Sequence, residues 1–412
     1  MTERDLAELL RERALAHRVP GAVIGVLQDG EELVACHGVA NTQTGVPVTA
    51  ESRFGVGSLT KSMVATVVAR LADDGRLSLD DAIAARVPEL LGATWAERAT
   101  LRDLLANRSG LPLRVALEFD FAAGEDDDAV LSRFAARVAA EEPTQVGWSY
   151  SNAGWALLGR AIETVTGSVW EDAMRSVLLD PAGMRASGFE ASPARVAGHE
   201  GGIPVAPLAA RALGPAGTSM VSTVGDMLRF AALHLDDPVF APLREPQPSP
   251  RIYSWFDGWC LGWASFDWDG ARAWGWDSLL SGERSALRLL PDRRAAIVVM
   301  ANGETGRLLQ RDVLAELMAS LFDIRVPPLR LQAGSAGDLT QFAGVYAWPD
   351  RRVEVAAGGS SLRIDGQEAQ PIDQHAFVVD ATDPDNPTVT FWDDVLYVML
   401  WGLPRVAGAA SR

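Results

Sequence analysis

The chain has 412 residues, which is long enough for one large core and a small second domain. Hydrophobic residues make up 48% of the chain and charged residues 22%, a balance that is ordinary for a globular protein and excludes a disordered one. The formal charge of −17 excludes phosphate backbones and anionic membrane surfaces as favoured partners, because the summed field of the protein repels them.

The N-terminal part of the chain predicts a surface helix followed by a β-hairpin. Apolar residues at helical spacing predict the helix over residues 4–18, and Pro20-Gly21 ends it. No apolar signal core precedes this helix, and no run approaches the roughly 18 apolar residues of a membrane span, so we expect a cytoplasmic protein without a membrane partner. Residues 22–27 and 31–37 then predict a hairpin.

The middle of the chain is predicted to be helical, and strands return after it. The expected helices cover residues 58–72, 100–106, 127–140, 153–166, 169–178, 222–235 and 304–322. Apolar or aromatic runs between turn residues predict strands over 260–267, 271–276, 285–290 and 295–301. We expect the first hairpin and these late strands to form one antiparallel sheet flanked by the helices, which is an α+β fold.

A change in composition after residue 326 predicts a second domain. Pro327-Pro328 and the small residues that follow indicate a linker over residues 327–337, between a catalytic domain over 1–326 and a small β domain over 338–412. Short apolar runs joined by Gly, Asp and Pro predict strands over 353–356, 361–364, 376–379, 388–392 and 396–401. We expect these strands to form a small β-barrel or meander.

Lysine usage points to chemistry. The chain has 37 basic residues, of which Lys61 is the only lysine. A GC-rich genome explains a general drift from lysine to arginine, and exposed positions tolerate it. A site that needs a deprotonated amine does not tolerate it, because arginine keeps its proton in proteins. The sequence therefore predicts that Lys61 is a general base, and that arginine in its place would preserve the fold but not the chemistry.

The motif Ser58-Leu-Thr-Lys61 stands where a glycine-bearing loop enters a predicted helix. Residues three apart share a helix face, so the serine hydroxyl and the lysine amine can meet. The unpaired N–H groups at a helix start can also stabilise an oxyanion. The alternative is a helix N-cap followed by a solvated lysine. The flanking glycines, the apolar helix face and the absence of any other lysine favour Ser58 as a nucleophile.

The second motif is Tyr150-Ser-Asn152, which precedes a predicted helix and follows Trp148. The alternative is a loop tyrosine beside an asparagine cap. Its position after the serine–lysine motif favours a catalytic Tyr150, with Asn152 orienting either Lys61 or the substrate carbonyl.

Together these motifs resemble the serine β-lactamase and penicillin-recognising superfamily, in its class C β-lactamase-like branch of esterases, D-aminopeptidases and transacylases. The resemblance covers about residues 15–322 and rests also on residues 37–41, 53–61, 75–80, 104–112, 181–184 and 219–223. It implies a sheet domain beside an all-α subdomain, with an acyl-enzyme forming on Ser58 and with Lys61 and Tyr150 as the acid/base pair. The tail from Phe342 resembles the lipocalin-like domain of some members.

The third motif of this superfamily, Lys-Thr-Gly or His-x-Gly on a strand, is replaced in this chain. The favoured register sets Trp276-Asp277-Ser278 in its place, and Trp274 marks the alternative. An indole thus replaces the base that helps to hold a substrate carboxylate, which argues against β-lactamase and carboxypeptidase activity. The resemblance implies that the N–H groups of Ser58 and Leu279 hold the oxyanion. The residues predicted to contact the substrate are Trp148, Asn152, Trp274, Trp276, Asp277, Ser278 and Leu279.

Three functions fit these observations. The first is an esterase or amidase, which passes the acyl group to water. The second is a biosynthetic transacylase of a natural-product pathway, which passes it to a small amine or alcohol. The third is a penicillin-sensing or scaffold module without catalysis, which the retained Ser58, Lys61 and Tyr150 argue against. No metal-ligand spacing or cofactor motif occurs, so we expect no cofactor and small-molecule partners. The sequence leaves the oligomeric state open.

Overall fold

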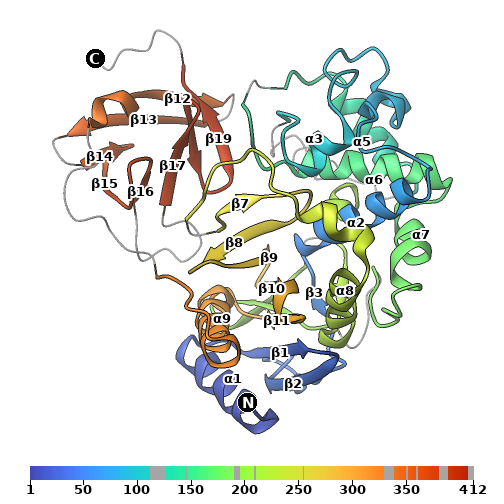
Figure 1. The fold of residues 1–412 in the computed structure, drawn as a ribbon, viewed down its shortest axis with the longest axis vertical. Helices are drawn as coiled ribbons and strands as arrows, with labels where there is room; N and C mark the ends of the chain where they lie inside the picture. The colour runs from blue at the N-terminus through green and yellow to red at the C-terminus, as the bar shows by residue number, and fades with distance from the viewer. Residues whose placement is uncertain are drawn as a thin grey trace.

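The structure is a computed structural model of the whole chain. It describes residues 1–111, 127–143, 146–189, 195–207, 210–253, 255–328, 338–348, 351–358, 361–379 and 388–406. A large sheet with its helices forms the lower part of the molecule in Figure 1, a helical region lies at the upper right, and a β-barrel lies at the upper left.

The large sheet has seven strands in the order β2-β1-β11-β10-β9-β8-β7, and each neighbouring pair is antiparallel. The strands are β1 (Gly21–Gln28), β2 (Glu31–Gly38), β7 (Gly258–Trp259), β8 (Ala264–Trp268), β9 (Ala271–Leu280), β10 (Glu283–Leu290) and β11 (Ala295–Ala301). The prediction that the first hairpin and the late strands share one antiparallel sheet is confirmed.

Helices cover both faces of this sheet. Against one face lie α1 (Glu3–Ala16) and α9 (Gly306–Phe322), and against the other lie α2 (Leu59–Asp73) and α8 (Val224–Asp236). Because both faces are covered, every residue of β10 and β11 is buried. Strand β3 (Phe54–Gly55) leads into α2 and pairs with β6 (Val221–Ser222) at the edge of this layer.

The helical region packs around α6 (Asn152–Thr166). Its other helices are α3 (Leu101–Leu105), α5 (Val130–Val138) and α7 (Trp170–Met174), which continues as a π-helical turn over Arg175–Leu179. Short 3₁₀ turns complete the layer at Ile83–Ala85, Pro88–Leu90, Arg211–Ala216 and Pro238–Arg244. Helix α2 packs against α6, so the start of α2 lies between the sheet and the helical region.

The C-terminal strands form an eight-stranded meander in which each strand pairs with the next. They follow the 3₁₀ turn Leu339–Phe342 and are β12 (Gly344–Trp348), β13 (Arg351–Gly358), β14 (Ser361–Ile364), β15 (Gln367–Pro371), β16 (Ala376–Val378), β17 (Thr388–Trp392), β18 (Val395–Val398) and β19 (Trp401–Pro404). A bridge between Tyr346 and Arg405 brings the first and last strands together, which nearly closes a barrel. The predicted α+β fold with a small C-terminal β-barrel is confirmed. Most of the predicted linker, residues 329–337, lies outside the described residues, so the domain boundaries stay predictions.

Two predicted strands are wrong in detail. The strand predicted over 260–267 begins only at Ala264, because the chain turns at Gly262, whose φ is +84° and whose N–H donates to the Leu105 carbonyl. A Cβ at Gly262 would lie 2.5 Å from the Ala65 Cβ on α2. The strand predicted over 396–401 is a hairpin, since Met399 takes a φ of +57° between β18 and β19.

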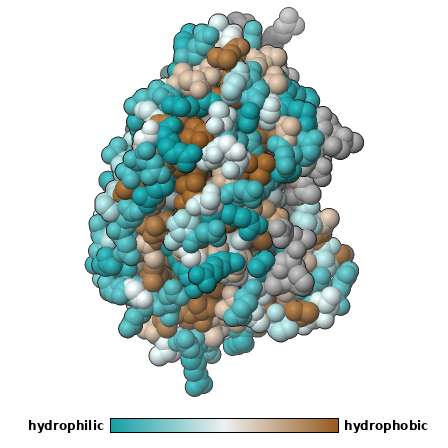
Figure 2. Space-filling view, turned by 90° about the vertical axis from the view of Figure 1, so that its right-hand side faces the viewer, coloured by the Kyte–Doolittle hydropathy of each residue, from teal (hydrophilic) through white to brown (hydrophobic). Residues whose placement is uncertain are grey.

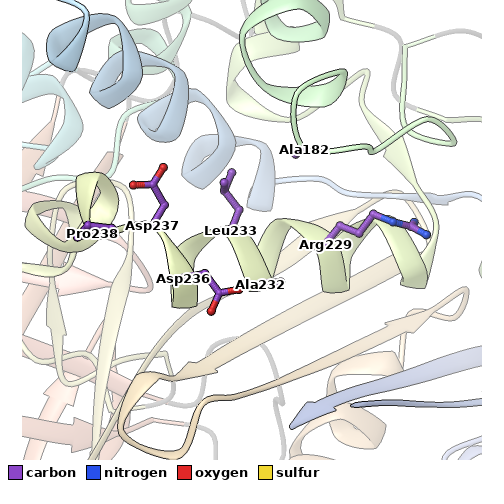
Figure 3. A pocket seen from close by; sticks show the side chains of 7 residues that line it. All are labelled: Ala182, Arg229, Ala232, Leu233, Asp236, Asp237 and Pro238. Carbon is purple, nitrogen blue, oxygen red and sulfur yellow. The ribbon is translucent and has the colours of Figure 1, made fainter. Parts of the chain in front are cut away.

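The surface carries hydrophobic residues in separate patches among hydrophilic ones, as Figure 2 shows for one face. Among the described residues, the large hydrophobic side chains that are exposed come from scattered elements and are Met1, Leu15, Val46, Leu91, Ile203 and Val406. A groove of about 500 Å³ follows α8, and none of its lining residues is a predicted site residue (Figure 3). Within the described ranges, no helix is both long enough and apolar enough to cross a membrane.

Candidate active site

Tight backbone packing positions the loop before α2. The Val56 N–H donates to the Met220 carbonyl at 3.0 Å, which continues the pairing of β3 with β6. Gly57 then takes a φ of +54°, and a Cβ there would lie 1.9 Å from the Ser278 hydroxyl oxygen. A Cβ at Gly217 would lie 2.3 Å from the Gly57 carbonyl oxygen. Glycine is therefore required on both sides of the peptide that presents Ser58.

The Ser58 side chain does not cap α2. Ser58 precedes the helix with φ −63° and ψ −11°, and its hydroxyl makes no capping hydrogen bond. Instead, its Oγ lies 3.2 Å from Lys61 Nζ and 3.0 Å from the Tyr150 hydroxyl. The N-cap alternative is therefore excluded by the geometry, because the Ser58 oxygen is engaged by the two groups that the sequence predicts as its acid/base pair.

Lys61 is buried, with 1% of its surface exposed. Its Nζ contacts the Ser58 hydroxyl and the Ala216 carbonyl, and lies 4.8 Å above the centre of the Tyr150 ring. No carboxylate forms an ion pair with this amine in the described part of the chain. Burial therefore acts unopposed and lowers the pKa of Lys61 well below its ordinary value. A neutral amine with a lone pair can accept the Ser58 proton, and the alternative of a solvated lysine is excluded.

Tyr150 is 5% exposed and donates its hydroxyl proton to Ser58 Oγ. Burial raises the pKa of the Tyr150 phenol, and the hydrogen bonds with Ser58 and Trp276 lower it by less. The phenol therefore stays protonated near neutral pH, as a proton donor beside Ser58. Its ring stacks on Trp276 at 5.6 Å between centroids and meets the edge of Trp259 at 6.1 Å, which fixes the ring plane.

Strand β9 passes beside the Ser58 loop. The Ser278 hydroxyl lies against Gly57, and the Leu279 carbonyl oxygen lies 3.7 Å from the position of a Cβ at Gly57. Ser278 is buried, and its hydroxyl has no hydrogen-bond partner in the part of the chain that the structure describes. Among the described residues the Ser58 N–H also has no acceptor. Polar groups without partners thus gather on this side of Ser58, where an oxyanion would need donors.

Other predicted contact residues lie outside this group. Side chains alternate along β9, so Asp277 points away from Trp276 and Ser278 and forms a bidentate ion pair with Arg288, at 2.6 and 3.0 Å. The Trp274 indole donates to the Arg244 carbonyl.

Trp148, which precedes the tyrosine motif, and Asn152, which ends it, also lie outside the group around Ser58. Trp148 is fully buried between Phe256, Trp259 and Tyr397. Asn152 begins α6 and is partly buried, and within the described ranges its side chain makes no hydrogen bond to Ser58, Lys61 or Tyr150. The structure therefore gathers Ser58, Lys61, Tyr150, Trp276 and Ser278, with Leu279 alongside.

A buried carboxylate that the sequence analysis missed supports the nucleophile loop. Glu283 on β10 accepts a hydrogen bond from the Gly55 N–H at 2.7 Å and pairs with Arg195 at 2.9 Å. Burial raises the pKa of Glu283, and the nearby Arg195 opposes that shift. The Ser285 hydroxyl donates to the Gly55 carbonyl. Both polar groups of Gly55, three residues before Ser58, are thus held by β10. No motif could have revealed this contact, because it joins a backbone to a residue far along the chain.

Asn107 is a second missed residue, although it lies inside one of the family-like segments. It takes a φ of +56° and accepts hydrogen bonds from the Trp155 indole and from the Ser151 N–H on its side-chain oxygen. Its carbonyl accepts from the Ser149 N–H at 2.9 Å. Asn107 therefore holds the segment that carries Tyr150. The described residues include no group of three or more His, Cys, Asp or Glu side chains able to hold a metal ion.

Comparison with known proteins places this geometry in context. The family profile described as Beta-lactamase matches residues 6–319. Penicillin-binding protein 4 of Amycolatopsis lactamdurans is 34% identical over 362 residues, which is 80% of this chain and 93% of that protein. Esterase EstB of Burkholderia gladioli is 32% identical over 207 residues, 46% of this chain and 51% of the esterase.

Among solved structures, SurE superposes with a TM-score of 0.82 at 28% identity, covering 98% of this chain and 99% of SurE. SurE has also been solved with D-Leu, and that structure gives a TM-score of 0.80 at 27% identity with the same coverage. The likeness to SurE therefore extends over the catalytic sheet, the helical region and the C-terminal barrel.

Proposed function

Because this chain belongs to the β-lactamase family, we propose that it is a serine acyl-transfer enzyme with Ser58 as its nucleophile. The observation that carries the proposal is the contact of Ser58 Oγ with both the buried amine of Lys61, whose pKa is lowered by burial, and the hydroxyl of Tyr150, whose pKa is raised by burial. A nucleophile, a base and an acid within hydrogen-bond distance are the parts that acyl transfer needs. A scaffold has no need for a neutral buried lysine, which is costly to maintain.

Acylation follows from these contacts. Ser58 Oγ attacks the carbonyl carbon of an ester or amide donor, and its proton passes to Lys61 Nζ. The carbonyl oxygen becomes an oxyanion, which the N–H groups of Ser58 and Leu279 hold, at about 3 to 4 kcal/mol for each donor by analogy with other acyl-transfer sites. Tyr150 gives its proton to the leaving group as the carbonyl bond to that group breaks, and Lys61 returns a proton to Tyr150 past Ser58 Oγ.

The second half-reaction runs in reverse. An acceptor loses its proton to the Tyr150 and Lys61 pair as it attacks the acyl carbon, and the pair returns a proton to Ser58 Oγ as the ester bond to Ser58 breaks. Water as acceptor makes the enzyme a hydrolase, and a small amine or alcohol makes it a transacylase. The transacylase is favoured by the aromatic side chains that pack around Tyr150, which include Trp259 and Trp276. Apolar surroundings disfavour water as the acceptor and favour an organic acceptor.

The relatives support a particular class of acyl donor. An esterase is among them, and SurE has been solved with D-Leu. We therefore include in the proposal that the acyl group is carried by an ester and has an apolar residue of D configuration. Trp276, which stands where the family has a basic residue, suits such an uncharged acyl group better than a free carboxylate.

The experiment is intact-mass spectrometry after incubation with para-nitrophenyl esters of N-acetyl-D-leucine and N-acetyl-L-leucine. Wild type is expected to gain the mass of one acyl group, faster from the D ester, and Ser58→Ala is expected to gain none. An identical adduct on Ser58→Ala, or no adduct on wild type with either ester, contradicts the assignment of the nucleophile. Adding a small amine and measuring amide against free acid then separates the transacylase from the hydrolase.

A further inference from the structure

The C-terminal barrel reaches into the candidate active site through the hairpin of β18 and β19. The Tyr150 N–H donates to the Leu400 carbonyl at 3.1 Å. The Tyr397 hydroxyl donates to the Trp148 carbonyl at 2.8 Å, and the Gly402 N–H donates to the Ser149 hydroxyl at 3.4 Å. Each residue of the segment 148–150 is therefore hydrogen-bonded to this hairpin.

The packing at this contact is as close as the hydrogen bonds imply. Tyr397 is 0% exposed, and its ring centroid lies 5.9 Å from that of Trp148. A Cβ at Gly402 would lie 3.2 Å from the Trp148 carbonyl oxygen, and a Cβ at Gly147 would lie 3.3 Å from the Trp392 ring. Tyr397 and Leu400 belong to the hydrophobic core of the catalytic domain rather than to that of the barrel. The hairpin is thus shared by the two cores, because Leu396, Val398 and Leu403 pack in the barrel.

The segment that carries Tyr150 is hydrogen-bonded to two parts of the molecule. Asn107 in the helical region takes the N–H groups of Ser149 and Ser151. The barrel donates a hydrogen bond to the Trp148 carbonyl and accepts one from the Tyr150 N–H. The backbone anchor of Tyr150 itself therefore lies in the C-terminal barrel, more than two hundred residues along the chain.

We propose that the C-terminal barrel completes the active site by fixing Tyr150 against Ser58, with Tyr397 as the positioning residue. The inference rests on the proposed role of Tyr150 as the proton donor. The Tyr150 hydroxyl is 3.0 Å from Ser58 Oγ, at the long end of the range for a hydrogen bond between two hydroxyl groups. A shift of about 1 Å takes it out of range and costs up to about 10²-fold in rate.

The test uses the dependence of acylation on the leaving group. An alkoxide leaves only with a proton from Tyr150, whereas para-nitrophenolate leaves without one. Tyr397→Phe removes the hydroxyl bond to Trp148 and little volume. We expect this variant to slow acylation by an N-acetyl-leucine ethyl ester about tenfold or more, with a lower kcat and an unchanged KM. Acylation by the para-nitrophenyl ester is expected to slow less than about twofold.

Tyr346→Phe is the matched control. Tyr346 is also a buried tyrosine of the barrel, and its hydroxyl donates to the Phe342 carbonyl at 2.9 Å, entirely within the barrel. Both variants lose one buried hydroxyl bond to a backbone carbonyl, so their losses of stability are comparable. Only Tyr397→Phe is expected to change the ratio of ethyl to para-nitrophenyl ester rates.

Tyr150→Phe provides the reference and separates the two ways of failing. If Tyr150→Phe slows the ethyl ester selectively while Tyr397→Phe matches Tyr346→Phe, the positioning role is refuted and the proposed function stands. If Tyr150→Phe treats both esters alike, Tyr150 is not the donor, and the proposed function fails together with this inference. Should Tyr397→Phe not fold, Gly402→Ala serves instead, because its methyl group would press on the Trp148 carbonyl. The same selective loss is expected, and an unchanged ratio refutes the inference.

Discussion

Replacing Lys61 with methionine is expected to slow acylation. It is also expected to make the variant progressively more stable relative to wild type as the pH falls. Methionine has nearly the length of lysine but no amine, so the buried position remains filled. Loss of the general base slows acylation by about 10²- to 10⁴-fold. The Ala216 carbonyl loses its partner, which costs about 1 to 3 kcal/mol of stability at every pH.

The pH dependence comes from the proton that wild type takes up on unfolding. Burial lowers the pKa of folded Lys61, so the amine is neutral at pH values above that lowered pKa, whereas unfolded lysine is protonated below its ordinary value of 10.5. Between the two pKa values, unfolding therefore binds one extra proton, and falling pH favours the unfolded wild type. The free energy of unfolding of wild type then drops by about 1.4 kcal/mol per pH unit relative to Lys61→Met. Below the folded-state pKa the difference becomes constant.

Urea unfolding of both proteins measures this slope. The 13 tryptophans supply the fluorescence signal, and subtracting the variant from wild type at each pH cancels all other titrating groups. We expect the difference to grow in favour of Lys61→Met as the pH falls from about 10 towards 7. A difference that is constant over this range would mean that Lys61 keeps its charge when folded. It could not then act as the base, and the proposed mechanism would be refuted without any activity measurement.

Two further predictions concern the surroundings of Ser58. Benzylpenicillin is expected to be turned over with a kcat/KM far below that of the best para-nitrophenyl ester, because the predicted register of the third motif sets Trp276 where a basic residue would hold the carboxylate. Equal values in steady-state kinetics would contradict this register. Gly57→Ala is expected to slow acylation by about tenfold or more, because φ is +54° and the new methyl group would overlap the Ser278 hydroxyl. Stopped-flow acylation at the wild-type rate would show that the loop relaxes freely.

The sequence predicted the parts of this protein that depend on local pattern. Helical spacing located α2 and α6, and the single lysine marked Lys61 before any motif was considered. Strand alternation explains why Asp277 lies apart from the residues gathered around Ser58. Asp277 occupies the middle of the third motif, but its neighbours Trp276 and Ser278 face the site, so Asp277 faces the other way and meets Arg288. A motif gives the position of a residue in the chain, whereas the face and the partner depend on the fold.

The contacts of the barrel with the Tyr150 segment show a second reason why parts of the site could not be predicted from the sequence. Two of the three bonds use a barrel backbone atom, the Leu400 carbonyl or the Gly402 N–H, and the third ends on the Trp148 carbonyl. Backbone atoms carry no sequence signature, so many sequences would serve equally well at these places. The sequence also predicts a single strand over residues 396–401, whereas the chain turns at Met399 and so presents Leu400.

Burial also changes one expectation about Lys61. The sequence predicts that arginine would preserve the fold, since arginine occupies every other basic position. The structure leaves 1% of Lys61 exposed and offers no carboxylate to it among the described residues. A larger and permanently charged guanidinium would have to be buried there without a counter-ion, which is strongly unfavourable. A loss of activity in that variant would not separate chemistry from folding, and methionine is the better replacement.

The C-terminal barrel also affects Lys61, because it holds the Tyr150 ring that shields the lysine amine from water. Burial lowers the pKa of Lys61, and its amine lies over the face of the Tyr150 ring. Tyr150 is in turn held by the hairpin that carries Tyr397 and Leu400. A barrel that moved away would release Tyr150, let water solvate the amine and return the Lys61 pKa towards its ordinary value. The second domain would then govern the base as well as the acid. Tyr397→Phe would move the pH at which acylation is half-maximal upwards and would leave the para-nitrophenyl ester rate unchanged only on the high-pH plateau, where the two esters are compared, whereas Tyr346→Phe would leave that pH in place.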